Sequence, residues 1–145
     1  MADFTFNIAK GRVAYYASLP AASDGLVIIA LESSGLEAQS VLEDKDDFAA
    51  VVAGTTNEQT TVGRMPLTNV TVTVDDTNNR VNVDADNVTW TTPTGNPVGA
   101  LVVCYDPDTT TGTDITLIPL THHGLSWTPD GNAFTANIAD LVRAS

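Results

Sequence analysis

The chain has 145 residues, a length that fits one domain with enough residues to bury a core. It carries 18 acidic and 6 basic residues, so its formal net charge is −12. A nucleic-acid-binding surface needs clustered lysine and arginine. Because the basic residues here are scattered singly, we expect no nucleic-acid partner, and we expect the acidity to give a well-solvated surface.

Three further features narrow the class of protein. The single cysteine, Cys104, excludes an intrachain disulfide, and the apolar run around it predicts a buried side chain and not a nucleophile. The N-terminus lacks a basic region followed by an apolar one, so we expect no signal peptide. The longest apolar run, Leu26–Leu31, is too short to cross a bilayer, and we expect no membrane partner.

The N-terminal part of the chain predicts strands. An extended N-terminus places Phe4 and Phe6 on one side, which fits an edge strand or an arm over residues 1–10 that reaches a neighbouring subunit. Residues Gly11–Ala17 contain valine and two tyrosines and predict a second strand. The run Leu26–Leu31 is continuously apolar between turn signals, which is typical of a strand buried on both faces.

The segment Leu36–Ala53 is the one helix candidate. Ser40 fits the N-cap, with Glu43 three residues later as in a capping box, and Gly54 fits the C-terminal end. The following residues, Thr55–Met65, are polar and predict a loop or an edge strand.

The segment from Thr68 to Ala85 alternates between apolar and polar residues, which predicts a β-hairpin. Folding the chain about Thr77-Asn78 sets Val74 opposite Val81, Val72 opposite Val83, Val70 opposite Ala85, and Asp75 opposite Arg80. Asparagine tolerates the left-handed conformation that a tight turn needs. This register places all the valines on one face, so we expect another part of the chain to cover that face.

The rest of the chain consists of short apolar segments between turns rich in Gly, Pro, Asn and Asp. The predicted strands are Val88–Thr91, Gly99–Tyr105, Ile115–Leu120 and Phe134–Ile138. Short strands at regular spacing indicate a mainly β fold, namely an antiparallel β-sandwich or barrel with one short helix. No linker or repeat divides the sequence, so we predict a single β domain over residues 1–145.

No pattern typical of catalysis occurs in the sequence. His122 and His123 are adjacent, and in a strand their side chains point to opposite faces, which prevents them from sharing one metal ion. The acidic segments 75–79, 84–87 and 106–114 are candidate cation loops, but their Asp and Asn residues are better explained as turn caps. We therefore predict no enzyme, no metal and no cofactor, and we assign no catalytic, cofactor-binding or metal-binding residue.

Several stretches are distinctive as strings of residues. They are Met1–Tyr16, the pair Leu19-Pro20, the block Val70–Trp90 and the run Val102–Thr109. Together they resemble a family of small acidic proteins encoded by tailed phages of actinobacteria, and the resemblance runs over nearly the whole chain. It implies a virion component, in particular a decoration (cement) protein that binds the outer surface of the capsid and stabilises it.

The resemblance also implies partners and a location. The partner is the major capsid protein, and the place is the outer capsid surface of a virion made in the host cytoplasm. A homo-oligomer is expected, with a trimer favoured because decoration proteins commonly occupy three-fold positions. We assign Phe4, Phe6 and Arg12 to capsid or subunit contact. The helix region and the loops Thr91–Pro97 and Asp106–Asp114 are further candidate docking elements.

Three other functions stay open. A head–tail connector or tail structural protein differs from a decoration protein in its copy number, which is about six or twelve for a cyclic ring. A carbohydrate-binding β-sandwich displayed on the virion needs exposed aromatic residues, whereas we expect Trp90 and Trp127 to pack in the core or at a strand end. An enzyme is the least favoured, because no catalytic set is visible.

Overall fold

The computed structural model describes residues 2–138 and 141–144. The predicted domain, 1–145, and the predicted arm, 1–10, therefore include residues that lie outside the described ones. The chain is mainly β, with 35% strand and 12% helix in antiparallel sheets, which confirms the predicted fold class. The described residues form three short α-helices, where the sequence predicted one.

The centre of the fold is a five-stranded sheet in the order β1-β8-β7-β2-β3. Its strands are β1 (Phe4–Thr5), β2 (Gly25–Glu32), β3 (Met65–Pro66), β7 (Val98–Asp106) and β8 (Ile118–Trp127). All neighbouring strands in this sheet run antiparallel. The continuous apolar run predicted as a doubly buried strand is β2, which lies between β7 and β3.

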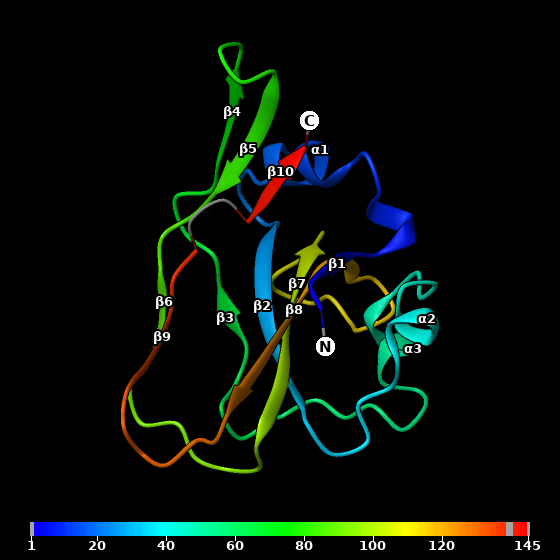
Figure 1. The fold of residues 1–145 in the computed structure, drawn as a ribbon, viewed down its shortest axis with the longest axis vertical. Helices are drawn as coiled ribbons and strands as arrows, with labels where there is room; N and C mark the ends of the chain where they lie inside the picture. Colours follow the sequence, from blue (N-terminus) through cyan, green and yellow to red (C-terminus); the bar gives the residue numbers. More distant parts are fainter. Residues whose placement is uncertain (1, 139–140, 145) are drawn as a thin grey trace.

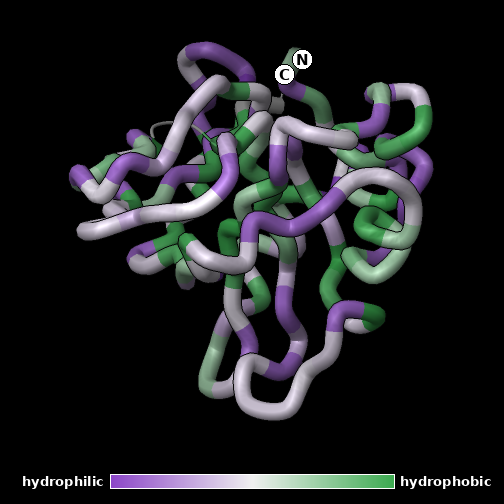
Figure 2. The backbone as a smooth tube through the Cα atoms, turned by 90° about the horizontal axis from the view of Figure 1, so that it is seen from below, coloured by the Kyte–Doolittle hydropathy of each residue, from purple (hydrophilic) through white to green (hydrophobic). Residues whose placement is uncertain are grey.

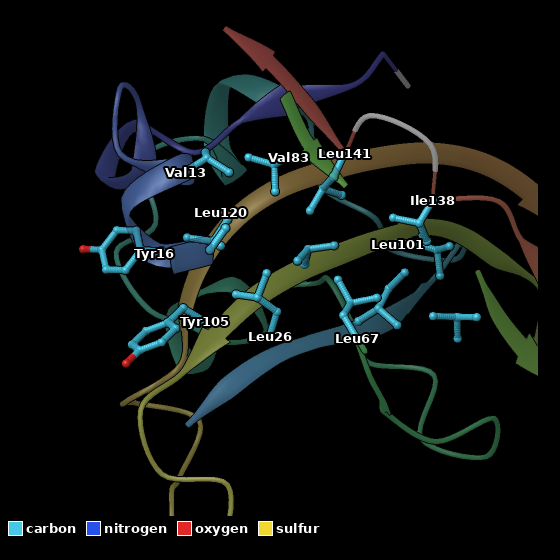
Figure 3. Close-up of a cluster of buried hydrophobic side chains, with 14 of the residues drawn as sticks. Val13, Tyr16, Leu26, Leu67, Val83, Leu101, Tyr105, Leu120, Ile138 and Leu141 are labelled. Carbon is cyan, nitrogen blue, oxygen red and sulfur yellow. The ribbon is translucent and has the colours of Figure 1, made fainter. Parts of the chain in front are cut away.

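Both faces of this sheet are covered, which explains why β2 and β7 are apolar without alternation. On one face, Leu26, Ile28, Leu101, Val103 and Leu120 pack with Val13, Tyr16, Leu67, Val83, Ile138 and Leu141 (Figure 3). On the other face, Ile29, Leu31, Val102 and Cys104 pack with Phe6, Leu42, Phe48, Val51 and Leu117. Hydrophilic residues gather in the peripheral loops (Figure 2).

A second sheet has the order β10-β5-β4 and contains β4 (Thr71–Asp75), β5 (Arg80–Asp84) and β10 (Val142–Ala144). Its β4–β5 hairpin has the predicted register, with Val72 opposite Val83, Val74 opposite Val81 and Asp75 opposite Arg80. Asn79 has a φ of +51°, as the predicted left-handed turn requires.

The expected cover over the hairpin's valine face is only partial. Val83 is 1% exposed at the base of the hairpin, whereas Val74 is 68% exposed toward its tip. The reason is that the hairpin extends beyond the rest of the molecule (Figure 1). The expectation that another part of the chain covers this face is therefore met only at the base of the hairpin.

A third pair of strands, β6 (Val88–Trp90) and β9 (Phe134–Ala136), lies on one side of the central sheet. The helices α2 (Gln39–Leu42) and α3 (Phe48–Val51) lie on the other (Figure 1). The register of β6 with β9 pairs Trp90 with Phe134. Both strands were predicted, and each ends one or two residues earlier than its predicted range.

The strand predicted over Gly11–Ala17 is wrong. Residues Asn7–Ala9 form a 3-10 helix, and Val13–Ser18 form helix α1. Val13, Tyr16 and Ala17 are buried, a spacing of three and four residues that matches one face of a helix. Burial of this face outweighs the strand preference of valine and tyrosine.

The single helix predicted over Leu36–Ala53 is replaced by two short ones, α2 (Gln39–Leu42) and α3 (Phe48–Val51). Ser40 does not cap α2, because the helix begins one residue earlier and its N-cap position is Ala38. Asp47 separates the two helices, since its side chain accepts a hydrogen bond from the Ala50 amide and starts α3.

Candidate functional site

The structure brings two of the three predicted contact residues together and leaves the third apart from them. The rings of Phe4 and Phe6 have centroids 5.2 Å apart. Phe6 is fully buried against the central sheet, and Phe4 is partly buried in β1. Arg12 is exposed at the start of α1. Their assignment to capsid or subunit contact stays a prediction; of the three, Arg12 is exposed, Phe4 is partly exposed and Phe6 is buried.

The N-terminal segment is held to β8 by the carboxylate of Asp3. Its Oδ1 accepts a hydrogen bond from the Gly124 amide at 2.9 Å, and its Oδ2 lies 3.3 Å from Nδ1 of His123. The other ring nitrogen of His123, Nε2, lies 2.9 Å from the Thr121 hydroxyl. Residue 3 is therefore tied to the same strand that pairs with β1.

The contacts from Asp3 through His123 to Thr121 have the order of a carboxylate–imidazole–hydroxyl relay. A nucleophilic hydroxyl must reach its substrate, and Thr121 is only 2% exposed. The relay also joins the N-terminal segment to β8, because the Asp3 carboxylate accepts a hydrogen bond from the Gly124 amide in addition to its contact with the His123 ring. We interpret the three residues as a tether for the N-terminus. No sequence pattern links position 3 with positions 121–124, so sequence analysis missed this tether.

A cavity of about 600 Å³ opens beside this tether. Its lining combines apolar residues (Ile28, Leu101, Val103, Leu125, Phe134, Ile138 and Leu141 among them) with the polar side chains of Asp3, Thr121, His123 and Asn137. Such a mixture is usual for a small-molecule site. Ile138 and Leu141 border the cavity, and the two residues between them lie outside the described ones. The wall of the cavity that the structure describes most fully is therefore the one formed by β1 and β8.

His122 and His123 lie within β8 and point to opposite faces of the sheet, as the alternation of a strand predicts. His122 is fully buried, and its ring stacks on Phe4 with centroids 4.4 Å apart. Neither ring nitrogen has a hydrogen-bond partner among the described residues. Burial, the larger cause, and the neighbouring His123 together lower the pKa of His122 to about 4. His122 is therefore neutral at pH 7.

The acidic loops are closed by their own hydrogen bonds, as expected for turn caps. Asp108 accepts from the hydroxyl and amide groups of Thr110 and Thr111, and these bonds hold the pKa of its carboxyl well below the usual value. Bonds from Asn78 likewise lower the pKa of Asp75. Within residues 2–138 and 141–144, no three metal-ligating side chains converge.

The aromatic residues predicted to be structural are packed. Trp90 is 3% exposed, and its indole nitrogen donates to the Gly63 carbonyl at 3.2 Å. Trp127, the last residue of β8, stacks on Phe134 with centroids 4.0 Å apart. Cys104 is fully buried, and burial raises the pKa of its thiol. The predictions for both tryptophans and for Cys104 are confirmed.

Comparison with known proteins gives no family for the chain. No protein-family model matches it, and neither the curated proteins nor the solved structures contain a match. The resemblance to phage virion proteins therefore stays a prediction. No helix of the described residues is long and apolar enough to span a membrane.

Proposed function

We propose that this chain is a structural protein of a phage particle, a decoration protein that binds the outer surface of the capsid. The proposal starts from the resemblance of the sequence. The structural observation that supports it is a strand-built domain that carries a net charge of −12. Such a domain can be displayed in many copies without a cofactor or a moving part.

Ion pairing makes the acidic surface more one-sided than the composition alone suggests. The guanidinium of Arg64 contacts Glu58 at 2.6 Å and Asp114 at 2.8 Å, and Arg80 contacts Asp75 at 3.1 Å. Two of the six basic residues are thus occupied within the chain. A surface of this kind repels packaged DNA and keeps neighbouring copies soluble, which suits the outside of a shell.

Binding to the assembled shell gives a direct mechanism of stabilisation. A protein that binds the closed capsid and not its separated subunits shifts the equilibrium toward the closed form by mass action. This mechanism needs only a complementary surface repeated over the shell, and it requires no chemistry from the cavity or from His123.

The copy number in purified particles tests the proposal. Quantitative mass spectrometry should give a ratio to the major capsid protein that is one or a simple fraction of one. A count of about six or twelve per particle would instead assign the chain to a connector or tail ring. Absence from particles would contradict any virion role and reopen the carbohydrate-binding and enzyme alternatives.

A further inference from the structure

Strand β4 is the free edge of the three-stranded sheet. Its partner is β5 on one side, and among the described residues no backbone hydrogen bond reaches its other side. Exposed edges in natural proteins are usually protected by lysine, proline, a bulge or a cover. Residues Thr71–Val74 carry no lysine, proline or bulge, and Val72 and Val74 are 37% and 68% exposed although helix α1 contacts part of this strand.

We propose that β4 pairs with β4 of a second copy of this chain, antiparallel and about a two-fold axis at Thr73. A two-fold contact requires an edge that is complementary to itself. With Thr73 at the axis, Val72 of each copy faces Val74 of the other, and Thr71 faces Asp75. The two three-stranded sheets then join into one continuous six-stranded sheet.

The position of the axis follows from the limits of the strand. Strand β4 has five residues, and Thr73 is its centre, so this register pairs all five. Asn69, two residues before the strand, has a φ of +51° and cannot extend the ladder. A register centred on Val72 would place Asn69 opposite Asp75 and use the strand less completely.

The distribution of charge along β4 favours a second copy of the chain as its partner, although the chain as a whole is acidic. The pairing surface from Thr71 to Val74 is uncharged, and Asp75 is already held by Arg80 and Asn78. The two Asp75 residues lie at opposite ends of the paired strands, about 14 Å apart at ~3.4 Å per residue. That separation exceeds the Debye length of about 8 Å at physiological salt, so their repulsion is largely screened.

The surface area that the two copies bury against each other determines how strong this contact is. A pairing of five residues per copy buries less than the ~800 Å² per partner that is typical of stable complexes. We therefore expect a weak, concentration-dependent dimer. Salt should strengthen it by screening the repulsion between two acidic chains. The inference does not depend on the proposed capsid role, although an array of copies would raise the local concentration.

Sedimentation equilibrium of the purified chain over a wide concentration range tests the association. The average mass should rise toward twice that of one chain, and more steeply with added salt. Val74→Glu should weaken the association by about tenfold or more, because it places a carboxylate against the partner's valine. Ile115→Glu is the matched control, since Ile115 is also 68% exposed but lies outside the hairpin.

Cysteine cross-linking tests the register. Thr73→Cys should form an interchain disulfide on mild oxidation, because residues facing each other across a two-fold axis lie within disulfide reach. Thr71→Cys should not, because its two copies lie about 14 Å apart in this register. The native Cys104 is fully buried and does not interfere. A chain that stays monomeric at every concentration, an equal effect of Val74→Glu and Ile115→Glu, or no cross-link through Thr73→Cys would each overturn the proposal.

Discussion

The burial of His122 ties the stability of the fold to pH. Its imidazole is neutral and unpaired between Phe4 and the central sheet, and its pKa of about 4 lies below the ~6.5 of an unfolded histidine. Between these two values the unfolded chain binds a proton that the folded chain does not. The free energy of unfolding therefore falls as the pH is lowered from about 6.5 to about 4.

We expect this loss to be roughly 3 kcal/mol over that interval. Urea unfolding of the wild type and of His122→Phe across the interval measures it, since phenylalanine keeps the stacking on Phe4 but cannot be protonated. Relative to the variant, the wild type should lose roughly 3 kcal/mol of unfolding free energy as the pH is lowered from about 6.5 to about 4, and the difference should be nearly constant outside this interval. Parallel curves would show that His122 takes up its proton equally in the folded and unfolded chain, which would contradict this prediction.

At the scale of elements, the hydrogen bond between Asp47 and the Ala50 amide, 2.7 Å long, determines where α3 begins. Phe48 and Val51 of this helix are both fully buried against the central sheet. Asp47→Ala should lower the free energy of unfolding by about 1 kcal/mol, because the amide loses its cap. Denaturant midpoints give the measurement. The neighbouring exposed residue provides the control, since Asp46→Ala should change stability by less than about 0.5 kcal/mol. Equal effects would contradict the capping role.

The elements that sequence analysis predicted correctly are those in which one local pattern decides the structure. The register of β4 with β5 follows from valine alternation, and β2 follows from an uninterrupted apolar run. Helix α1 was missed because Val13, Tyr15 and Tyr16 favour strands individually. The buried residues Val13, Tyr16 and Ala17 are three and four positions apart, which is the spacing of one helix face. A prediction that gave this spacing more weight than the strand preference of each residue would have found the helix.

The candidate site was less predictable, because it depends on contacts between distant parts of the chain. The pairing of Phe4 with His122 decides both the burial of that histidine and the position of Asp3 beside His123. The exposure of Val74 depends on how far the hairpin extends beyond its neighbours. Alternation predicts which face a valine shares with others, and it does not predict whether a second layer reaches that face.

At the scale of the whole molecule, the net charge of −12 acts against the folded state through repulsion among carboxylates. Screening this repulsion should raise the free energy of unfolding by about 1 kcal/mol and the melting temperature by roughly 3 °C between about 20 and 300 mM NaCl. Thermal unfolding followed by circular dichroism measures the shift.

A variant with a smaller net charge is the control for this salt effect. The double variant Asp46→Lys, Asp76→Lys changes two exposed positions. Each substitution raises the net charge by two units, so the net charge rises from −12 to −8. Its melting temperature should respond less to salt than that of the wild type. A melting temperature that falls with salt would instead mean that ion pairs such as Arg64 with Glu58 outweigh the general repulsion.

The connections of the central sheet determine when it can form. Strand β2 pairs with β7, with Gly25 opposite Asp106, and β1 pairs with β8, with Phe4 opposite His122. During synthesis on a ribosome, β2 must therefore wait for most of the chain before its main partner emerges, whereas the β4–β5 hairpin closes from a short local turn. Long-range pairings of this kind fold slowly, on the order of milliseconds to seconds. Because the hairpin forms before the central sheet, an incomplete chain leaves the apolar strand β2 without its partner β7. Strand β2 is then open to association with other chains.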